Sequence, residues 1–198
     1  MDLENFFNKI SQINIQYFII LNKALNYSII PYFLSIFSIF FEIKIFLIFY
    51  VSYIFYFHKK SQLKSKINKK TFFYFIKSTQ CYFLFVIIFY IIKKLSKVPR
   101  PFCILNNVQT ILHNLDHSIC YQSFPSAHTG LAFLLGIQCW KYAQIWQKFI
   151  IIITIFLASL SRISLALHFP LDLISSLPIT LIIYHLNNLI SRIFFKNL

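Results

Sequence analysis

The sequence has few acidic residues, few glycines and little charge of any kind. Of its 198 residues only 12% are charged, five are Asp or Glu, and two are Gly. A soluble domain averages about 25% charged residues, so too few remain here to cover a water-soluble globule. The scarcity of glycine excludes a collagen-like chain, the apolar content excludes a disordered one, and four cysteines are too few for a disulfide scaffold.

Apolar and aromatic side chains are abundant instead. Hydrophobic residues make up 58% of the chain, aromatic residues 20%, and the mean hydropathy is +0.68. A bilayer core of about 30 Å needs about 20 mostly apolar helical residues for each crossing. The composition therefore predicts an all-α, polytopic membrane helix bundle, and the length predicts a single domain.

Four apolar segments in the second part of the sequence are candidates for membrane-spanning helices. We expect helices over residues 71–92, about 125–140, 149–167 and 170–190. Pro178 lies inside the last of these, where we expect a kink that neighbouring helices absorb. Lys77 lies near the start of the first, and snorkelling toward the inner face explains it.

The first part of the sequence leaves the number of crossings open. Residues 5–25 are weakly amphipathic, which is typical of an interfacial helix or of a poor first span. Residues 27–57 are apolar apart from Glu42 and Lys44, and we interpret them as a partly interfacial piece up to Phe41 followed by a span. We therefore expect five or six transmembrane helices in the whole chain.

Positive charge is concentrated between two apolar runs. Nineteen Lys and Arg face five acidic residues, a net charge of +14, and six lysines lie within residues 59–70. Lys and Arg accumulate in the cytoplasmic loops of membrane proteins, so we place residues 58–70 inside and residues 93–124 and 162–171 outside. Nucleic-acid binding would instead need a soluble domain to carry the basic patch, and the sequence contains none.

Three polar clusters lie at the outward ends of the expected helices. They read Lys93-x6-Arg100-Pro101, Pro125-Ser126-Ala127-His128 and Ser161-Arg162-x5-His168-x3-Asp172. The cations of the first and third clusters have few acidic partners on that side, which favours an external polyanion as their counter-charge. The alternative is that they snorkel to lipid headgroups.

The third cluster pairs a carboxylate with an imidazole. An unpaired ionised carboxylate at the mouth of an apolar helix costs roughly 2.5–3.5 kcal/mol, so Asp172 needs a partner. His168 lies four residues earlier, and a helical turn would place both on one face. A carboxylate that binds one imidazole nitrogen leaves the other free to attack. The alternative is a pair that only caps a helix.

The second cluster has the features of a helix start. Pro125 suits a first turn and Ser126 suits a cap, and helix N-termini present free N–H groups to anions. His128 would point into the same site, unless this is a plain capping motif with an incidental histidine. Together, the cations, the helix terminus and the two histidines fit phosphoryl transfer.

In combination and in this order, the three clusters resemble the signature of the type-2 phosphatidic acid phosphatase superfamily, membrane relatives of bacterial acid phosphatases and vanadium haloperoxidases. The resemblance rests on residues 93–172. It implies a single membrane-embedded phosphatase domain over residues 1–198, with N-terminal interfacial and first spans over 1–57 and a catalytic helical core over 71–190. It also implies an inner-membrane enzyme with its active site facing the periplasm, and no metal or other cofactor.

The resemblance assigns a role to each motif residue. His168 resembles the nucleophile that forms a phosphohistidine, Asp172 its orienting partner, and His128 the acid that protonates the leaving group. The residues that resemble phosphate ligands are Lys93, Arg100, Ser126, Ala127 and Arg162. Ala127 departs from the family pattern, where Gly is usual, but a helix start has negative φ and Ala should fit there.

The implied substrate is a phosphorylated lipid of the surrounding bilayer, with nucleic acid excluded as a partner. No residue distinguishes a phosphomonoester from a diphosphate, so undecaprenyl diphosphate and lipid A stay open as alternatives. From another class, the chain would be a catalytically silent phospholipid-binding or transport protein. The intact His128, His168 and Asp172 argue against such silence.

The outer loop, residues 101–124, holds two cysteines and two histidines. Our preferred interpretation of Cys103 and Cys120 is two free thiols in a loop that covers the substrate. A disulfide is the second interpretation, because the outward side of a bacterial inner membrane is oxidising. A zinc site with His113 and His117 is the third, since the tight Cys-x2-Cys spacing is missing.

Three further side chains lie away from the motifs. Cys81 and Cys139 fall within expected spans, where we interpret them as packing residues. His185 lies near the inner face, and we interpret it as interfacial.

Overall fold

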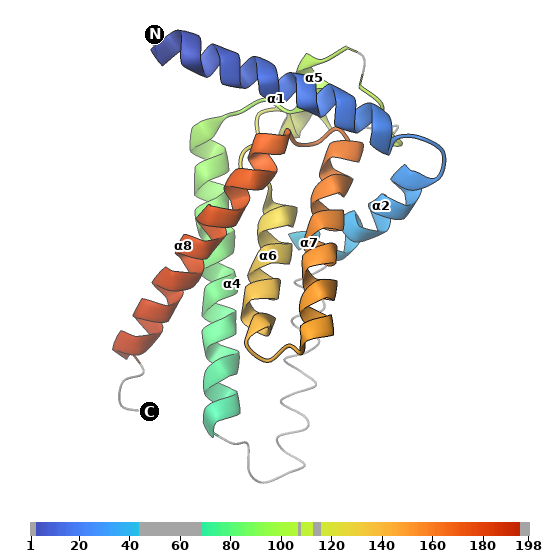
Figure 1. Cartoon of the computed structure of the whole chain (residues 1–198). Helices are drawn as coiled ribbons and strands as arrows, with labels where there is room; N and C mark the ends of the chain where they lie inside the picture. The colour runs from blue at the N-terminus through green and yellow to red at the C-terminus, as the bar shows by residue number, and fades with distance from the viewer. Residues whose placement is uncertain (1–2, 44–68, 107, 113–115, 195–198) are drawn as a thin grey trace.

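The computed structural model describes residues 3–43, 69–106, 108–112 and 116–194, and those residues contain helices and no strand (Figure 1). The helices are α1 (Leu3–Leu25), α2 (Ile30–Phe40), α4 (Lys69–Ser96), α5 (Pro101–Ile104), η1 (a 3₁₀ helix, His117–Ile119), α6 (Ala127–Trp140), α7 (Ile145–Ser164) and α8 (Pro170–Phe194). The all-α membrane bundle expected from the composition is confirmed.

Three of the described helical segments are long and apolar enough to cross a membrane: Phe73–Ile104, Ile145–Ser164 and Pro170–Ile193. A fourth is added if Asn8–Leu25 and Ile30–Phe40, which meet at 110°, count together as one broken span. The span expected before the basic loop lies outside the described residues. The total of five or six crossings therefore stays a prediction.

Helix α6 is the centre of the bundle, and both glycines of the chain lie in it. A Cβ on Gly130 would lie 2.6 Å from the Phe89 ring of α4, and one on Gly136 would lie 2.8 Å from Ile151 of α7. Such distances are too short for a methyl group, so the two glycines let α4 and α7 approach α6 from different sides. This close approach fixes the end of α6 relative to the ends of its neighbours.

The first helix lies across one end of the bundle (Figure 1). Phe18 of α1 packs edge-on against Phe169, with ring centroids 5.3 Å apart, in an apolar cluster beneath the helix. The exposed apolar side chains of α7 and α8, among them Ile153, Phe156 and Ile174, cover the sides of the bundle that face lipid. Of the two interpretations of residues 5–25, this arrangement favours the interfacial helix.

Hydrogen bonds from two asparagines tie α1 to the far end of the sequence. Asn22 is 3% exposed and donates to the carbonyls of Ile163 and Gln109, each at 2.9 Å, while it accepts from the Gln109 N–H at 2.9 Å. Asn26 donates to the Ser164 carbonyl at 3.0 Å. The last carbonyls of α7 have no partners within that helix, so these amides complete its C-terminal end.

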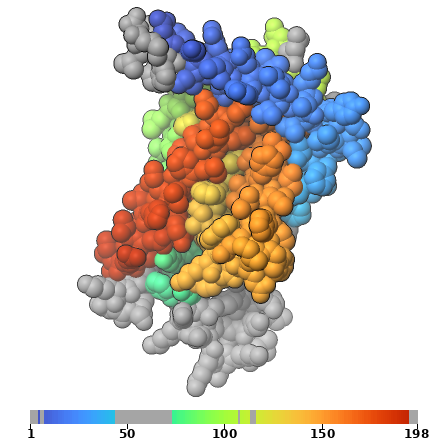
Figure 2. All heavy atoms as spheres, viewed as in Figure 1, coloured from blue at the N-terminus to red at the C-terminus, as the bar shows by residue number. Residues whose placement is uncertain are grey.

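Figure 2 shows α7 and α8 side by side on the viewed face, with α6 visible between them and α1 across the top. Helix α8 continues through Pro178, and the kink expected at this proline stays a prediction. Cys81 is buried, but Cys139 is exposed at the end of α6, so the interpretation of Cys139 as a packing residue is wrong.

Candidate active site

The three motif clusters meet at the end of the bundle that α1 covers. Two cations come from the ends of long helices: Lys93 is in the last turn of α4 and Arg162 is in the last turn of α7. Arg100 directly precedes α5, and His128 is in the first turn of α6. His168 and Asp172 flank the start of α8. The Ser126 N–H donates to the Asp172 carbonyl at 3.2 Å, which joins the second cluster to the third. The sequence separates these groups by up to 79 positions between Lys93 and Asp172, yet they form one site.

The His168–Asp172 pair is present but is not a direct hydrogen bond. His168 Nδ1 lies 3.8 Å from Asp172 Oδ2, and both residues are almost fully buried. His168 precedes α8, so the helical turn expected to align the pair does not include it. The distance is beyond hydrogen-bond reach, although it permits electrostatic attraction to a protonated imidazole.

Ser123 holds the carboxylate, and the sequence analysis did not identify it. Its hydroxyl donates to Asp172 Oδ2 at 2.5 Å, and the same oxygen accepts the Phe169 N–H at 2.8 Å. Ser123 is completely buried in the segment before α6. These two bonds fix the carboxylate on the Nδ1 side of His168.

Several buried donors around this site have no hydrogen-bond partner in the described part of the chain. They include Nε of Arg100, Nε of Arg162 and the hydroxyl of Ser126. Buried polar groups are normally paired, so a cluster of unpaired donors indicates a place for an acceptor such as a phosphate oxygen. Ser126 occupies the N-cap position of α6, as expected, but its hydroxyl makes no capping hydrogen bond.

The outer segment before Ser123 positions the first two cations. Lys93 Nζ donates to the Gln122 main-chain carbonyl at 2.7 Å, and Nη2 of Arg100 donates to the same carbonyl at 3.4 Å. The Arg100 main-chain N–H donates to the Cys120 carbonyl at 2.7 Å. Lys93 and Arg100 are therefore both held by the segment between Cys120 and Gln122.

Arg162 is held by a residue that the sequence analysis also missed. It is 5% exposed, and its Nη1 donates to the hydroxyl of Ser38 in α2, which packs against α7. Ser38 lies in an apolar stretch with no motif around it, so no signal in the sequence marks it. Helix α2 thus supplies a polar contact to the third cation.

The cations and burial act together on the histidine. Burial, and then the positive charges of Lys93 and Arg100, hold the pKa of the His168 imidazole well below its usual range. His128 is half-buried and lies in the field of the same cations. At neutral pH His168 is therefore an uncharged imidazole, the form that can act as a nucleophile.

The backbone conformation at the second cluster agrees with the expectation for Ala127. It is the first residue of α6, is 7% exposed, and is absent from the three described non-glycine residues with positive φ. One of those three is Ala166, with φ of 55°, in the turn that leads from Arg162 to His168. Ala127 therefore fits the helix start without strain.

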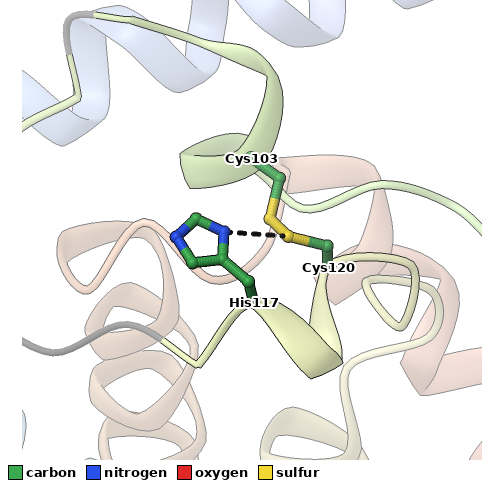
Figure 3. A group of neighbouring side chains, drawn as sticks. All are labelled: Cys103, His117 and Cys120. Carbon is green, nitrogen blue, oxygen red and sulfur yellow. Dashed lines mark hydrogen bonds between the residues drawn. A yellow bond between two sulfur atoms is a disulfide. The ribbon is translucent and has the colours of Figure 1, made fainter.

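The outer loop contains a disulfide between Cys103 and Cys120 (Figure 3). The preferred interpretation of two free thiols is therefore wrong. His117 Nδ1 lies 3.7 Å from Cys120 Sγ, but two sulfurs joined by a covalent bond do not offer the thiolates that zinc requires. His113 lies outside the described residues. The disulfide ties the chain just after Arg100 to the chain just before Gln122.

Fold and site together define an integral membrane protein with a buried cluster of cationic and histidine side chains at one end of a helix bundle. The chain belongs to the PAP2 superfamily, whose family model matches residues 75–196. This agrees with the family that the motifs resemble and makes the chain a membrane phosphatase by family.

A solved structure has a similar fold. The crystal structure of Aquifex aeolicus LpxE superposes with a TM-score of 0.69 and 20% identity, covering 88% of this chain and 94% of that chain. At this identity the likeness shows the fold alone. No curated protein matches the chain. The matched family region excludes α1 and α2, which carry Asn22 and Ser38.

Proposed function

We propose that the protein hydrolyses a phosphomonoester or diphosphate on a membrane lipid through a phosphohistidine at His168. The observation that carries this proposal is the convergence of two histidines with three cations and several unpaired buried donors at one end of the bundle. A tetrahedral phosphate has the charge and the acceptors that this set of groups lacks.

The first step transfers the phosphoryl group to the protein. Nε2 of His168 attacks phosphorus, and the bond from phosphorus to the lipid oxygen breaks. His128, which becomes protonated when the anionic phosphate binds beside it, gives that proton to the lipid oxygen. Asp172, held by Ser123, faces Nδ1 and stabilises the positive charge that develops on the imidazole. The lipid leaves as an alcohol, or as a monophosphate when the substrate is a diphosphate.

The second step regenerates the histidine. Water gives a proton to His128 and attacks phosphorus, the P–N bond breaks, and inorganic phosphate leaves. Through both steps Lys93, Arg100 and Arg162, the Ser126 hydroxyl and the Ala127 N–H at the start of α6 bind the phosphoryl oxygens. These groups supply the positive charge that a metal ion supplies elsewhere, so metal independence is part of the proposal.

The position of the site suits a lipid substrate. Exposed apolar side chains of α8, Leu171 and Ile174, reach the end of the bundle where the site lies, so a lipid reaches it from the bilayer beside α8. Six lysines lie within residues 59–70, before and at the start of α4, whose other end carries Lys93. This supports an inner-membrane protein with its site facing the periplasm. We propose residues 1–198 as one phosphatase domain. Undecaprenyl diphosphate and lipid A stay in the group of substrates to be tested.

The test is phosphate release by the full chain from a panel of lipid monophosphates and diphosphates. We expect His168→Ala and His128→Ala each to lower the rate by at least about 100-fold, the lower end of what a positioned acid, base or nucleophile contributes. His185→Ala changes an exposed histidine at the other end of α8 and is the matched control. EDTA should leave the wild-type rate unchanged.

Two results would contradict the proposal. Full phosphate release by both histidine variants would exclude the mechanism. If the wild type binds the lipids of the panel but releases phosphate from none of them, the result would favour the alternative of a catalytically silent lipid-binding protein. Acid-labile, base-stable phosphate on the wild type that is lost in His168→Ala would support the covalent intermediate.

A further inference from the structure

A second polar cavity lies at the opposite end of the bundle. Helix α4 continues past the turn that joins α6 to α7 (Figure 1), and α6 has only 14 residues against 28 in α4. The cavity between α4, this turn and α8 has a volume of about 420 Å³. Its lining includes Tyr74, Lys77, Gln138, Lys141, Tyr184 and Asn187. We call it the inner recess. Lys141 follows α6, whereas His128 begins it, so the recess is separate from the active site.

The inner recess is cationic and has no protein counter-charge. Lys77 and Lys141 both line it. The acidic residues of the chain are Asp2, Glu4, Glu42, Asp116 and Asp172. None of them lies in α4, in α6 or in the turn after it, and Asp172 is at the catalytic end of α8. Two ammonium groups beside one cavity without a carboxylate favour an anionic ligand.

Asn187 adds a buried acceptor to the recess. The side chain is 1% exposed, and its Nδ2 donates to the Lys77 carbonyl of α4 at 3.1 Å. This bond assigns the amide nitrogen, so Oδ1 is the acceptor, and Oδ1 has no hydrogen-bond partner among the described residues. A buried acceptor without a donor is costly. A ligand with a hydroxyl group would satisfy it.

An apolar groove adjoins the inner recess and points to a lipid. The groove has a volume of about 590 Å³ and shares Lys141 and Tyr184 with the recess. The rest of its lining is largely apolar and includes Phe133, Ile137 and Ile152. It follows α6 from Trp140 back toward the middle of the helix at Phe133. A free phosphate would have no use for such a groove, whereas an acyl chain would fill it.

We infer that the inner recess binds an anionic glycerophospholipid of the inner leaflet. Its phosphate lies between Lys77 and Lys141, a headgroup hydroxyl donates to Asn187 Oδ1, and one acyl chain lies in the groove between α6 and α7. Phosphatidylglycerol has this combination of charge and hydroxyl groups. The inference does not depend on the proposed catalytic function, because binding is measured without turnover.

The test is native mass spectrometry of the full chain in neutral detergent, with phosphatidylglycerol and phosphatidylcholine of identical acyl chains as probes. We expect the wild type to retain phosphatidylglycerol in preference. The double variant Lys77→Gln/Lys141→Gln should bind it about tenfold more weakly, since two charge-assisted contacts are lost. Arg192→Gln is the matched control, because Arg192 is an exposed cation in the last turn of α8 and lies outside both the recess and the groove.

Each outcome either supports the inference or overturns it. Equal retention of the two lipids, an unchanged double variant, or an equal loss in Arg192→Gln would overturn it. Displacement of the lipid by inorganic phosphate would assign the recess to a free anion instead. Ile152→Trp, which fills the exposed side of the groove, is a second variant that leaves the lysines in place, and it should also weaken retention. All variants should keep the wild-type rate of phosphate release in neutral detergent.

Discussion

At the scale of single residues, the site depends on small polar side chains as much as on the motif residues. Ser123 fixes the Asp172 carboxylate, and Ser38 accepts from Arg162. Each acts on a charged group that is almost fully buried. In such surroundings the loss of one hydrogen bond leaves a charge without its partner, so a single hydroxyl has a large effect.

Ser38→Ala tests this dependence at Arg162. Hydrogen bonds to buried charged groups contribute about 1.5–3 kcal/mol, so we expect kcat/KM for the lipid substrate to fall at least about tenfold. Steady-state phosphate release measures it. Ser35→Ala removes a hydroxyl from the same helix that bonds only to the Tyr32 carbonyl, and should leave kcat/KM unchanged. Equal effects of the two substitutions would show that α2 is merely destabilised.

The pH dependence of the reaction tests the environment of His168. Its pKa is held below the ordinary histidine value of about 6.5, so the imidazole stays neutral, and kcat/KM is retained, until the pH falls well below that value. Lys93→Gln removes a cation that disfavours the imidazolium. The pKa of His168 should therefore rise, and the acidic loss of kcat/KM should move to higher pH.

The comparison of the two normalised pH profiles is the measurement, because any titration of the substrate phosphate affects both proteins alike. Coincident profiles would mean that Lys93 does not act on the nucleophile.

The residues that sequence analysis identified and those that it missed differ in a physical way. Charged and histidine side chains at the ends of apolar helices are expensive to bury, so their presence indicates chemistry. Serine and asparagine carry no such cost. The partners of Ser123, Ser38 and Asn22 lie 49, 124 and 141 positions away in the sequence, and only the folded chain brings them together.

At the scale of elements, the outer loop supports the candidate active site. The disulfide joins Cys103, three residues after Arg100, to Cys120. The main-chain carbonyl of Cys120 accepts a hydrogen bond from the Arg100 N–H. Gln122 then accepts from Lys93. The loop thus fixes two of the proposed phosphate ligands, and the cysteine spacing alone did not distinguish this from two free thiols.

Replacement of both cysteines of the disulfide by serine tests this support. We expect a loss of about 3 kcal/mol in the free energy of unfolding, from the entropy of a loop of this length. We also expect a higher KM, because Arg100 is less constrained. Thermal unfolding in detergent and steady-state kinetics measure the two effects. Cys139→Ser, at an exposed free cysteine, is the control. Reductant should change the wild type in the same direction, and an unchanged KM would separate the disulfide from the site.

Among the larger elements, the helices around α6 follow the apolar runs of the sequence, whereas the arrangement of α1 and α2 does not. Runs of about 20 apolar residues predict a helix and its burial in lipid. The 110° turn between α1 and α2 depends instead on contacts with α7 and with the outer loop. Those contacts are tertiary, so amphipathicity alone left α1 open between an interfacial helix and a span.

At the scale of the whole molecule, the two ends of the bundle carry different polar sites. The candidate active site lies under α1, and the inner recess lies beside the turn after α6. In the orientation that we propose, with residues 58–70 inside, the first faces the periplasm and the second faces the cytoplasm. This orientation is measurable without any assumption about the substrate.

Cysteine labelling in bacteria with a permeabilised outer membrane tests the orientation. Leu95 is 77% exposed near the outer end of α4, and native Cys139 is exposed at the inner end of α6. A membrane-impermeant maleimide should label the variant Leu95→Cys/Cys139→Ser in intact cells, but should label the wild type only after lysis. The reverse pattern would place the catalytic pocket in the cytoplasm.

The bonds from Asn22 and Asn26 to the end of α7 also set an order of assembly during biosynthesis. The acceptor carbonyls of Ile163 and Ser164 emerge from the ribosome long after the first helix. The end of α7 that precedes the His168 turn therefore receives these bonds only when the first helix meets a much later part of the nascent chain. A truncated protein that begins at residue 75 would contain every motif and still lack the amides that bond to this end of α7.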